Sequence, residues 1–116
     1  MSVLTEINTI MDNISIPVET GVFSGVPPDE YCVLTPLSDR FAVFGDNRPQ
    51  IEVCEVRISL FSKGNYKKCK NQITAVLLAA DFVITDRRYI GHENDTAFFH
   101  YAIDVAKEQI LTEGDD

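Results

Sequence analysis

The sequence of 116 residues lacks most of the patterns that mark catalytic or membrane proteins. No apolar run approaches the roughly 20 residues needed to cross a bilayer. The glycines stand singly, which leaves no phosphate-binding glycine loop, and the serines have no nucleophile-elbow context. The start of the chain lacks the basic residues and apolar block of a secretory signal, so we expect synthesis in a reducing cytoplasm.

Cysteine is also scarce, and its spacing matches no zinc or redox motif. Cys32, Cys54 and Cys69 each fall on an apolar-facing position of a predicted strand or helix. We therefore expect three buried thiols that act as small hydrophobic residues. The alternative, a metal site assembled from the three cysteines and a histidine, has no support in the spacing.

The two histidines give no stronger signal. His92 lies with acidic residues in one short predicted turn and has no partner histidine at helical spacing. His100 lies on the strand face opposite Phe99 and Tyr101, as a surface or rim residue would. The sequence therefore predicts no catalytic residue, no metal ligand and no cofactor.

Basic residues are few, 10 against 18 acidic ones, and the net charge is −8. Such a chain would repel a phosphate backbone, so bulk binding of nucleic acid is not expected. The charge is unevenly distributed. A lysine patch, Lys63, Lys67, Lys68 and Lys70, crowds the junction between a predicted strand and helix, whereas the carboxyl end is acidic. The patch is either a solvated helix face or a basic surface for an acidic partner.

The clearest periodicity lies in residues 50–80, where a strand pattern turns into a helix pattern. From Cys54 to Leu60 every second residue is apolar, as in a strand with one buried face. From Tyr66 to Ala80 apolar residues recur at three- and four-residue steps, and Asn65 is a good amino-terminal cap. A strand of about eleven residues spans roughly 36 Å, which suggests a sheet that projects edges or loops toward partners.

Similar patterns predict the other elements. Residues 3–14 form an amphipathic helix that Ile16-Pro17 ends. Residues 18–23 and 31–37 are short strands that form a hairpin-like pair. Two further strands, which pair antiparallel, are expected over residues 82–90 and 96–105.

The composition, 45% hydrophobic and 24% charged, is typical of a globular protein of one domain. We predict an ordered core of about residues 1–106 and a charged tail of residues 107–116. The predicted fold is α+β: a single antiparallel or mixed β-sheet of about five strands with two helices packed on one face. The order of elements is α-β-β-β-α-β-β.

Residues 38–49 are predicted as a long connection that carries Phe41, Val43 and Phe44. A loop of this length in a compact domain is usually functional or mobile. Its apolar residues must bury against their own domain or against a partner, and the sequence leaves both open. We hypothesise that the loop is mobile in the free subunit and becomes ordered on contact.

The whole pattern resembles the small tail terminator, or tail completion, proteins of long-tailed bacteriophages and prophages. The resemblance runs from about Ile14 to Ala106 and is carried by the order of elements and by apolar and turn positions. It rests on the segments Ile16-Pro17-Val18-Glu19-Thr20-Gly21-Val22-Phe23, Tyr31-Cys32-Val33-Leu34-Thr35-Pro36-Leu37, Phe44-Gly45-Asp46-Asn47, Glu55-Val56-Arg57-Ile58-Ser59-Leu60-Phe61, Lys63-Gly64-Asn65, Tyr89-Ile90-Gly91-His92-Glu93 and Tyr101-Ala102-Ile103.

The resemblance implies a structural, non-enzymatic protein of the virion that caps the tail tube and joins the tail to the head. Such proteins form a ring, often of six subunits, between the tail-tube protein and a head-completion or connector protein. Ring closure requires two different patches on each subunit, which mate head to tail. The residues that we expect at these protein interfaces are Phe41, Val43, Phe44, Asp46, Asn47, Lys63, Lys67, Lys68 and Lys70.

Other interpretations remain open. Head-closure or neck proteins of the same virion share a related size and topology with tail terminators. A small α+β ligand-binding regulatory domain would use the same layout, with a concave pocket where polar groups converge. A small hydrolase or other enzyme is a third interpretation, for which the sequence offers no constellation of residues.

Overall fold

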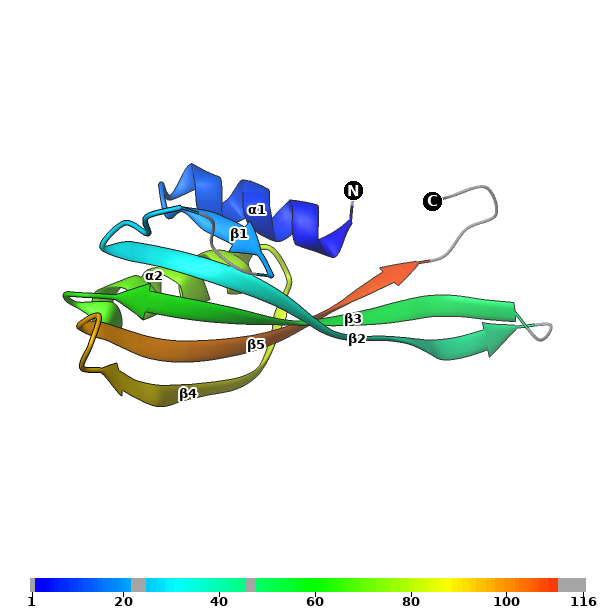
Figure 1. Ribbon diagram of the computed structural model, residues 1–116. Coiled ribbons are helices and arrows are strands. Elements are labelled where there is room, and N and C mark those ends of the chain that lie inside the picture. The colour runs from blue at the N-terminus through cyan, green and yellow to red at the C-terminus, as the bar shows by residue number, and fades with distance from the viewer. Residues whose placement is uncertain (1, 22–24, 46–47, 111–116) are drawn as a thin grey trace.

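The computed structural model describes residues 2–21, 25–45 and 48–110, except for the side chains at positions 43–45, 49 and 50. In these residues the elements follow in the predicted order α-β-β-β-α-β-β (Figure 1). They are α1 (Val3–Asn13), β1 (Val18–Thr20), β2 (Glu30–Gly45), β3 (Arg48–Ser62), α2 (Tyr66–Ala79), β4 (Val83–Glu93) and β5 (Phe98–Ile110).

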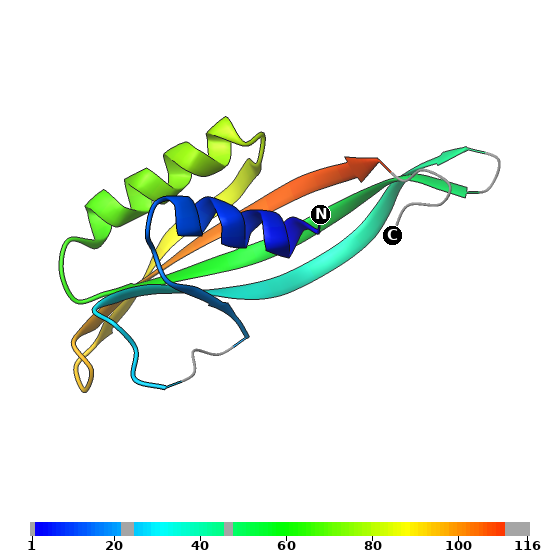
Figure 2. The ribbon, with the colours of Figure 1, turned by 90° about the horizontal axis from the view of Figure 1, so that it is seen from above.

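The five strands form one mixed sheet in the order β1-β2-β3-β5-β4. β3 lies antiparallel between β2 and β5, β4 lies antiparallel to β5, and β1 lies parallel to β2. Seen from above, both helices lie on the same side of the sheet (Figure 2). The predicted α+β class, with two helices on one face of the sheet, is confirmed, as is the antiparallel pairing of the last two strands.

The core lies between the helices and this face of the sheet. Side chains from α1, α2 and alternate positions of β2, β3 and β5 meet there, because a strand turns every second residue to one face. Asn65 caps α2 by accepting a hydrogen bond from the Lys68 amide, as predicted. The fully buried apolar residues include Ile7, Met11, Cys32, Leu34, Ile58, Leu60, Ile73, Leu77, Ile103 and Val105. Cys32, Cys54 and Cys69 are free and buried, which confirms the prediction for the thiols.

The prediction that residues 38–49 form a connecting loop is wrong. β2 and β3 continue through most of this segment and remain paired from Ser38 opposite Glu55 to Gly45 opposite Arg48. Pairing satisfies the backbone hydrogen-bonding groups that the two strands turn toward each other, and Phe and Val favour extended structure. We call residues 38–45 and 48–55 the hairpin arm. It projects beyond the helices and gives the molecule extents of 54 × 25 × 24 Å (Figure 1).

β1 and β2 do not form a hairpin-like pair. β1 runs parallel to β2, with Val18 opposite Cys32 and Thr20 opposite Leu34. The amide of Cys32 donates to the carbonyl of Pro17 at 2.8 Å, and that of Gly21 donates to Leu34 at 2.9 Å. Gly21 has a φ of 87°, a conformation that glycine adopts readily, at the start of the connection that returns to β2. Val22 and Phe23, which were included in the predicted strand, lie outside the described residues.

The predicted boundary between core and tail, after Ala106, is also wrong. β5 continues to Ile110 because β3 still pairs with it as far as Ile51. Lys107, the first residue of the predicted tail, joins β5 to α1 and to the connection between α2 and β4. Its ammonium contacts the Glu6 carboxylate, donates to the Ala80 carbonyl at 2.9 Å and lies 4.5 Å from the Phe82 ring centroid. Residues 111–116 lie outside the described part of the chain.

Candidate functional site

The exposed part of β2 is the candidate interaction surface. Residues 35–42 are all exposed, although they are part of β2. β1 pairs with β2 at residues 32–34, so beyond Leu34 no described strand lies along the outer edge of β2. Phe41 is 52% exposed in this stretch. A strand that is exposed on both faces and along one edge is available for contact with another chain.

The predicted interface residues divide between the two ends of the molecule. Phe41, Val43 and Phe44 all lie on β2 in the hairpin arm, whereas Asp46 and Asn47 lie outside the described residues. The lysine patch lies at the opposite end of β3 and along the start of α2. β3 has 15 residues, which corresponds to roughly 45 Å of strand. The structure therefore separates the arm from the lysine patch.

The lysine patch is itself divided. Lys63 lies 3.9 Å from the Asp29 carboxylate, and its ammonium is 5.0 Å from the Phe98 ring centroid. Lys70 is half-buried, with its ammonium 4.9 Å from the Tyr101 ring centroid. Lys67 and Lys68 are exposed on α2. Aromatic rings thus support Lys63 and Lys70, while Lys67 and Lys68 form the solvated part of the patch.

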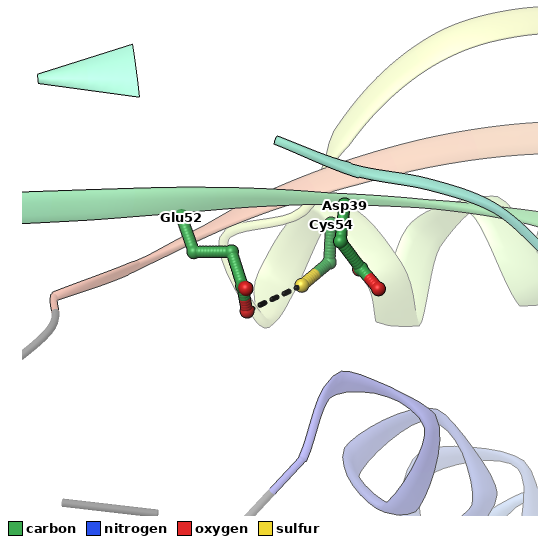
Figure 3. A group of neighbouring side chains, drawn as sticks. All are labelled: Asp39, Glu52 and Cys54. Atoms are coloured by element: carbon green, nitrogen blue, oxygen red, sulfur yellow. Dashed lines mark hydrogen bonds between the residues drawn. The ribbon is translucent and has the colours of Figure 1, made fainter. Parts of the chain in front are cut away.

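The base of the arm carries a cluster that the sequence did not predict: Asp39, Glu52 and Cys54 (Figure 3). Their ligand atoms all lie within 4.8 Å of one another. The Cys54 thiol donates to a Glu52 carboxylate oxygen at 3.4 Å and lies 3.8 Å from the Gln109 side-chain oxygen. These residues line a cavity of about 260 Å³ together with Ser2 and other residues at the start of α1.

The Cys54 thiol in this cluster is protonated near neutral pH. Burial, together with hydrogen bonds and charge from Asp39 and Glu52, raises the pKa of Cys54 to about 12. The thiol is therefore not a nucleophile near neutral pH. The two carboxylates and the sulfur offer three donor atoms to a cation, which would have to displace the thiol proton. Glu52 and Cys54 share a strand face in the sequence pattern, but no local signal placed Asp39 beside them.

The raised pKa of Cys54 gives a testable pH dependence. An ordinary thiol titrates near pH 9, so above that pH the unfolded chain loses a proton that the folded chain retains. This contribution to stability is complete below about pH 9 and is lost as the pH rises toward 12. We expect the free energy of unfolding of the wild type to fall more steeply from about pH 8 to about pH 10.5 than that of Cys54→Ala. Urea unfolding across this range measures both slopes, and equal slopes would contradict the assignment.

The helix-free face of the sheet carries an ion pair and an aromatic row. Arg57 donates two hydrogen bonds to Asp104, at 2.8 and 3.0 Å. His100 stacks on Phe61 with ring centroids 4.3 Å apart, and Tyr31 stacks on the same ring at 4.9 Å. Burial lowers the pKa of His100 and favours its neutral form. These contacts join β2, β3 and β5 across the helix-free face.

Two of the shallow hollows outside the arm exceed the cavity at its base in volume. One, of about 380 Å³, lies on the helix-free face beside Tyr31 and Phe61. The other, of about 540 Å³, lies between α1 and β1 and is lined by polar groups that include Asn8 and Thr9. Asn8 donates to the Leu4 carbonyl and Thr9 to the Thr5 carbonyl, so these groups are already bonded within α1.

No helix in residues 2–21, 25–45 and 48–110 is long and apolar enough to span a membrane. The chain was also compared with known proteins. Neither a protein-family model nor a curated protein matches it.

Proposed function

We propose that this chain is a structural component of a phage tail, a ring-forming subunit that terminates the tail tube and joins the tail to the head. The observation that carries the proposal is the hairpin arm, which extends a small body to a length of 54 Å. An arm of this kind lets a subunit reach a neighbour without any change in its own core. The order of elements resembles that of tail terminators. This resemblance is the reason for proposing a ring at the end of the tail tube.

The exposure of the arm supports a role in contact. Residues 35–42 are exposed on both faces of β2, and Phe41 presents half of its aromatic surface. Aromatic residues are enriched at the energetic centres of protein interfaces, where they are desolvated by the partner. The opposite end of the molecule presents Lys67 and Lys68, so each subunit has two chemically different ends. Two unlike ends suit contact with two different neighbours along the tail axis.

The variant Phe41→Asp tests the proposal. Tubes assembled from the cognate tail-tube protein that the proposal requires would be mixed with wild type or variant, and bound protein would be measured by co-sedimentation. Electron microscopy of the tube ends would locate it. We expect the wild type to cap the ends and Phe41→Asp to weaken binding at least about tenfold, because a charge replaces an interface aromatic.

Leu78→Asp provides the matched control, because Leu78 is 54% exposed but lies on α2, away from the arm. We expect it to bind as the wild type does. Circular dichroism would establish that both variants are folded. Wild-type protein that ignores tubes but binds the connector would favour the head-closure alternative. Wild-type protein that binds neither, but retains a metabolite, would favour the regulatory-domain alternative.

A further inference from the structure

Two strand edges of this sheet lack a strand partner among the described residues. β4 is the last strand in the order β1-β2-β3-β5-β4, so its outer edge is open along residues 83–93. On the other side of the sheet, β1 covers β2 at residues 32–34 and leaves residues 35–45 open. Residues 85–90 of β4 and 35–42 of β2 are also exposed on their faces. Open edges with this much exposed surface are templates for pairing with another strand.

The strand directions allow these two edges to pair between copies. β2 is antiparallel to β3, β3 to β5, and β5 to β4, so β2 and β4 run in opposite directions within one sheet. When neighbouring copies share the same orientation, β4 of one copy lies antiparallel beside β2 of the next. Antiparallel pairing needs no crossover connection and extends the sheet from subunit to subunit.

The charges on the two edges select one register. Asp39 and Arg87 both lie on the helix side of the sheet, Asp39 opposite Cys54 and Arg87 opposite Ile103. The next residue toward the tip of the arm, Arg40, turns to the helix-free side, as does Asp86, which lies opposite Asp104.

A single register therefore places Asp39 against Arg87 and Arg40 against Asp86, with each pair on one side of the sheet. A shift by two residues places Arg40 against Arg88 instead. Like charges directly opposite each other destabilise a strand pair, whereas opposite charges stabilise it.

We propose that copies of this chain join edge to edge, with residues 35–43 of one copy paired antiparallel with residues 83–91 of the next. The proposal rests on the ring-forming role proposed above and names the surfaces that close the ring. Exposed apolar side chains flank the charges on both edges: Leu37 and Phe41 on β2, Tyr89 and Ile90 on β4. The partner is thus a second copy of this chain.

Contacts within the subunit leave these charges available. Arg40 bonds Glu55 through one terminal nitrogen at 2.5 Å, and its side chain is 57% exposed. Arg87 donates to the Thr74 hydroxyl at 3.4 Å through one of its nitrogens. Asp86 lies 3.6 Å from Arg88, with its side chain 48% exposed. Asp39 is hydrogen-bonded to the Cys54 thiol but is itself exposed. Arg40, Asp86 and Arg87 can therefore face an incoming strand without displacement of a core residue, and Asp39 presents an exposed carboxylate at the same edge.

A cysteine pair provides the direct test. The double variant Asp39→Cys, Arg87→Cys is made in a Cys54→Ser background, because Cys54 lies opposite residue 39 in the same subunit and would compete for its thiol. Cross-strand neighbours in adjacent copies then lie close enough for a disulfide to form on mild oxidation. We expect a ladder of linked subunits in non-reducing electrophoresis that ends at the ring size measured by native mass spectrometry. The remaining natural cysteines, Cys32 and Cys69, are buried and should contribute no links. The control Asp95→Cys, Arg87→Cys places one thiol in the turn before β5 and should give no ladder.

Charge reversal provides the second test. Asp39→Arg and Arg87→Asp should each raise the dissociation constant of the oligomer at least about tenfold, and their combination should restore most of the loss. The control Asp95→Arg should have no effect. If a ring forms but no disulfide joins position 39 of one copy to position 87 of the next, the proposal of edge pairing is overturned and the ring-forming function stands. Protein that stays monomeric at its highest soluble concentration and gives no link would also overturn edge pairing, and the tube-binding experiment would then decide the function by itself.

Discussion

Replacing Leu77 with alanine is expected to lower the free energy of unfolding by roughly 3–4 kcal/mol. Leu77 is fully buried and lies with Ile73 and Cys69 on the face of α2 that packs on the sheet. The substitution removes apolar atoms from this core and leaves a cavity that the surrounding strands cannot fill completely. Urea unfolding monitored by circular dichroism measures the change.

Leu78→Ala is the matched control for this experiment. Leu78 is the next residue on the same helix, is 54% exposed, and undergoes the same change in helix propensity. We expect its loss of stability to stay below about 1 kcal/mol, because little apolar surface is removed from the core. Equal losses for the two leucines would mean that α2 does not pack on the sheet through the face described above.

Replacing Asp104 with alanine is expected to lower the free energy of unfolding by about 2 kcal/mol. Asp104 is 9% exposed and accepts two hydrogen bonds from Arg57. The Arg57 guanidinium stays charged after the substitution, because an arginine side chain does not lose its proton near neutral pH. A partly buried cation would then lack its partner. The 32% exposure of the Arg57 side chain keeps the loss below that of a fully buried pair.

The exposed pair Lys63–Asp29 provides the comparison. Its atoms lie 3.9 Å apart, and the Asp29 side chain is 86% exposed. Solvent screens such pairs, so Asp29→Ala should change stability by less than about 0.5 kcal/mol. A double-mutant cycle of Arg57→Met and Asp104→Ala would isolate the coupling between Arg57 and Asp104. A coupling near zero would contradict the role assigned to this pair.

The elements that were predicted correctly from the sequence are those whose residue pattern is set by positions close together along the chain. The two-residue period from Cys54 to Leu60 and the helical spacing from Tyr66 to Ala80 each reflect one buried face. A continuous core on one side of the sheet imposes that periodicity directly. The buried thiols were predicted for the same reason, since each cysteine occupies an apolar position of such a pattern.

The hairpin arm was missed because its signal is not local. Residues 38–49 contain Asp, Gly, Asn and Pro, which favour turns. The strand conformation of residues 38–45 and 48–49 depends on pairing between β2 and β3. The same pairing creates the cluster at the base of the arm. Asp39 reaches Cys54 through a register that is shifted by an irregularity between Pro36 and Ser38. A shift of this kind changes which side chains meet and leaves no mark in sequence periodicity.

The strand order has a further consequence for how the molecule unfolds. The hairpins β2–β3 and β4–β5 each close short segments of chain. The contact between β3 and β5 joins residues that are farther apart, such as Arg57 and Asp104, which are 47 positions apart. Closing that longer loop costs more entropy. The buried side chains of the two hairpins also belong to one core that crosses the boundary between β3 and β5. When the hairpins separate, each therefore exposes apolar side chains that the other had covered. We therefore expect both to lose structure together, in one cooperative transition.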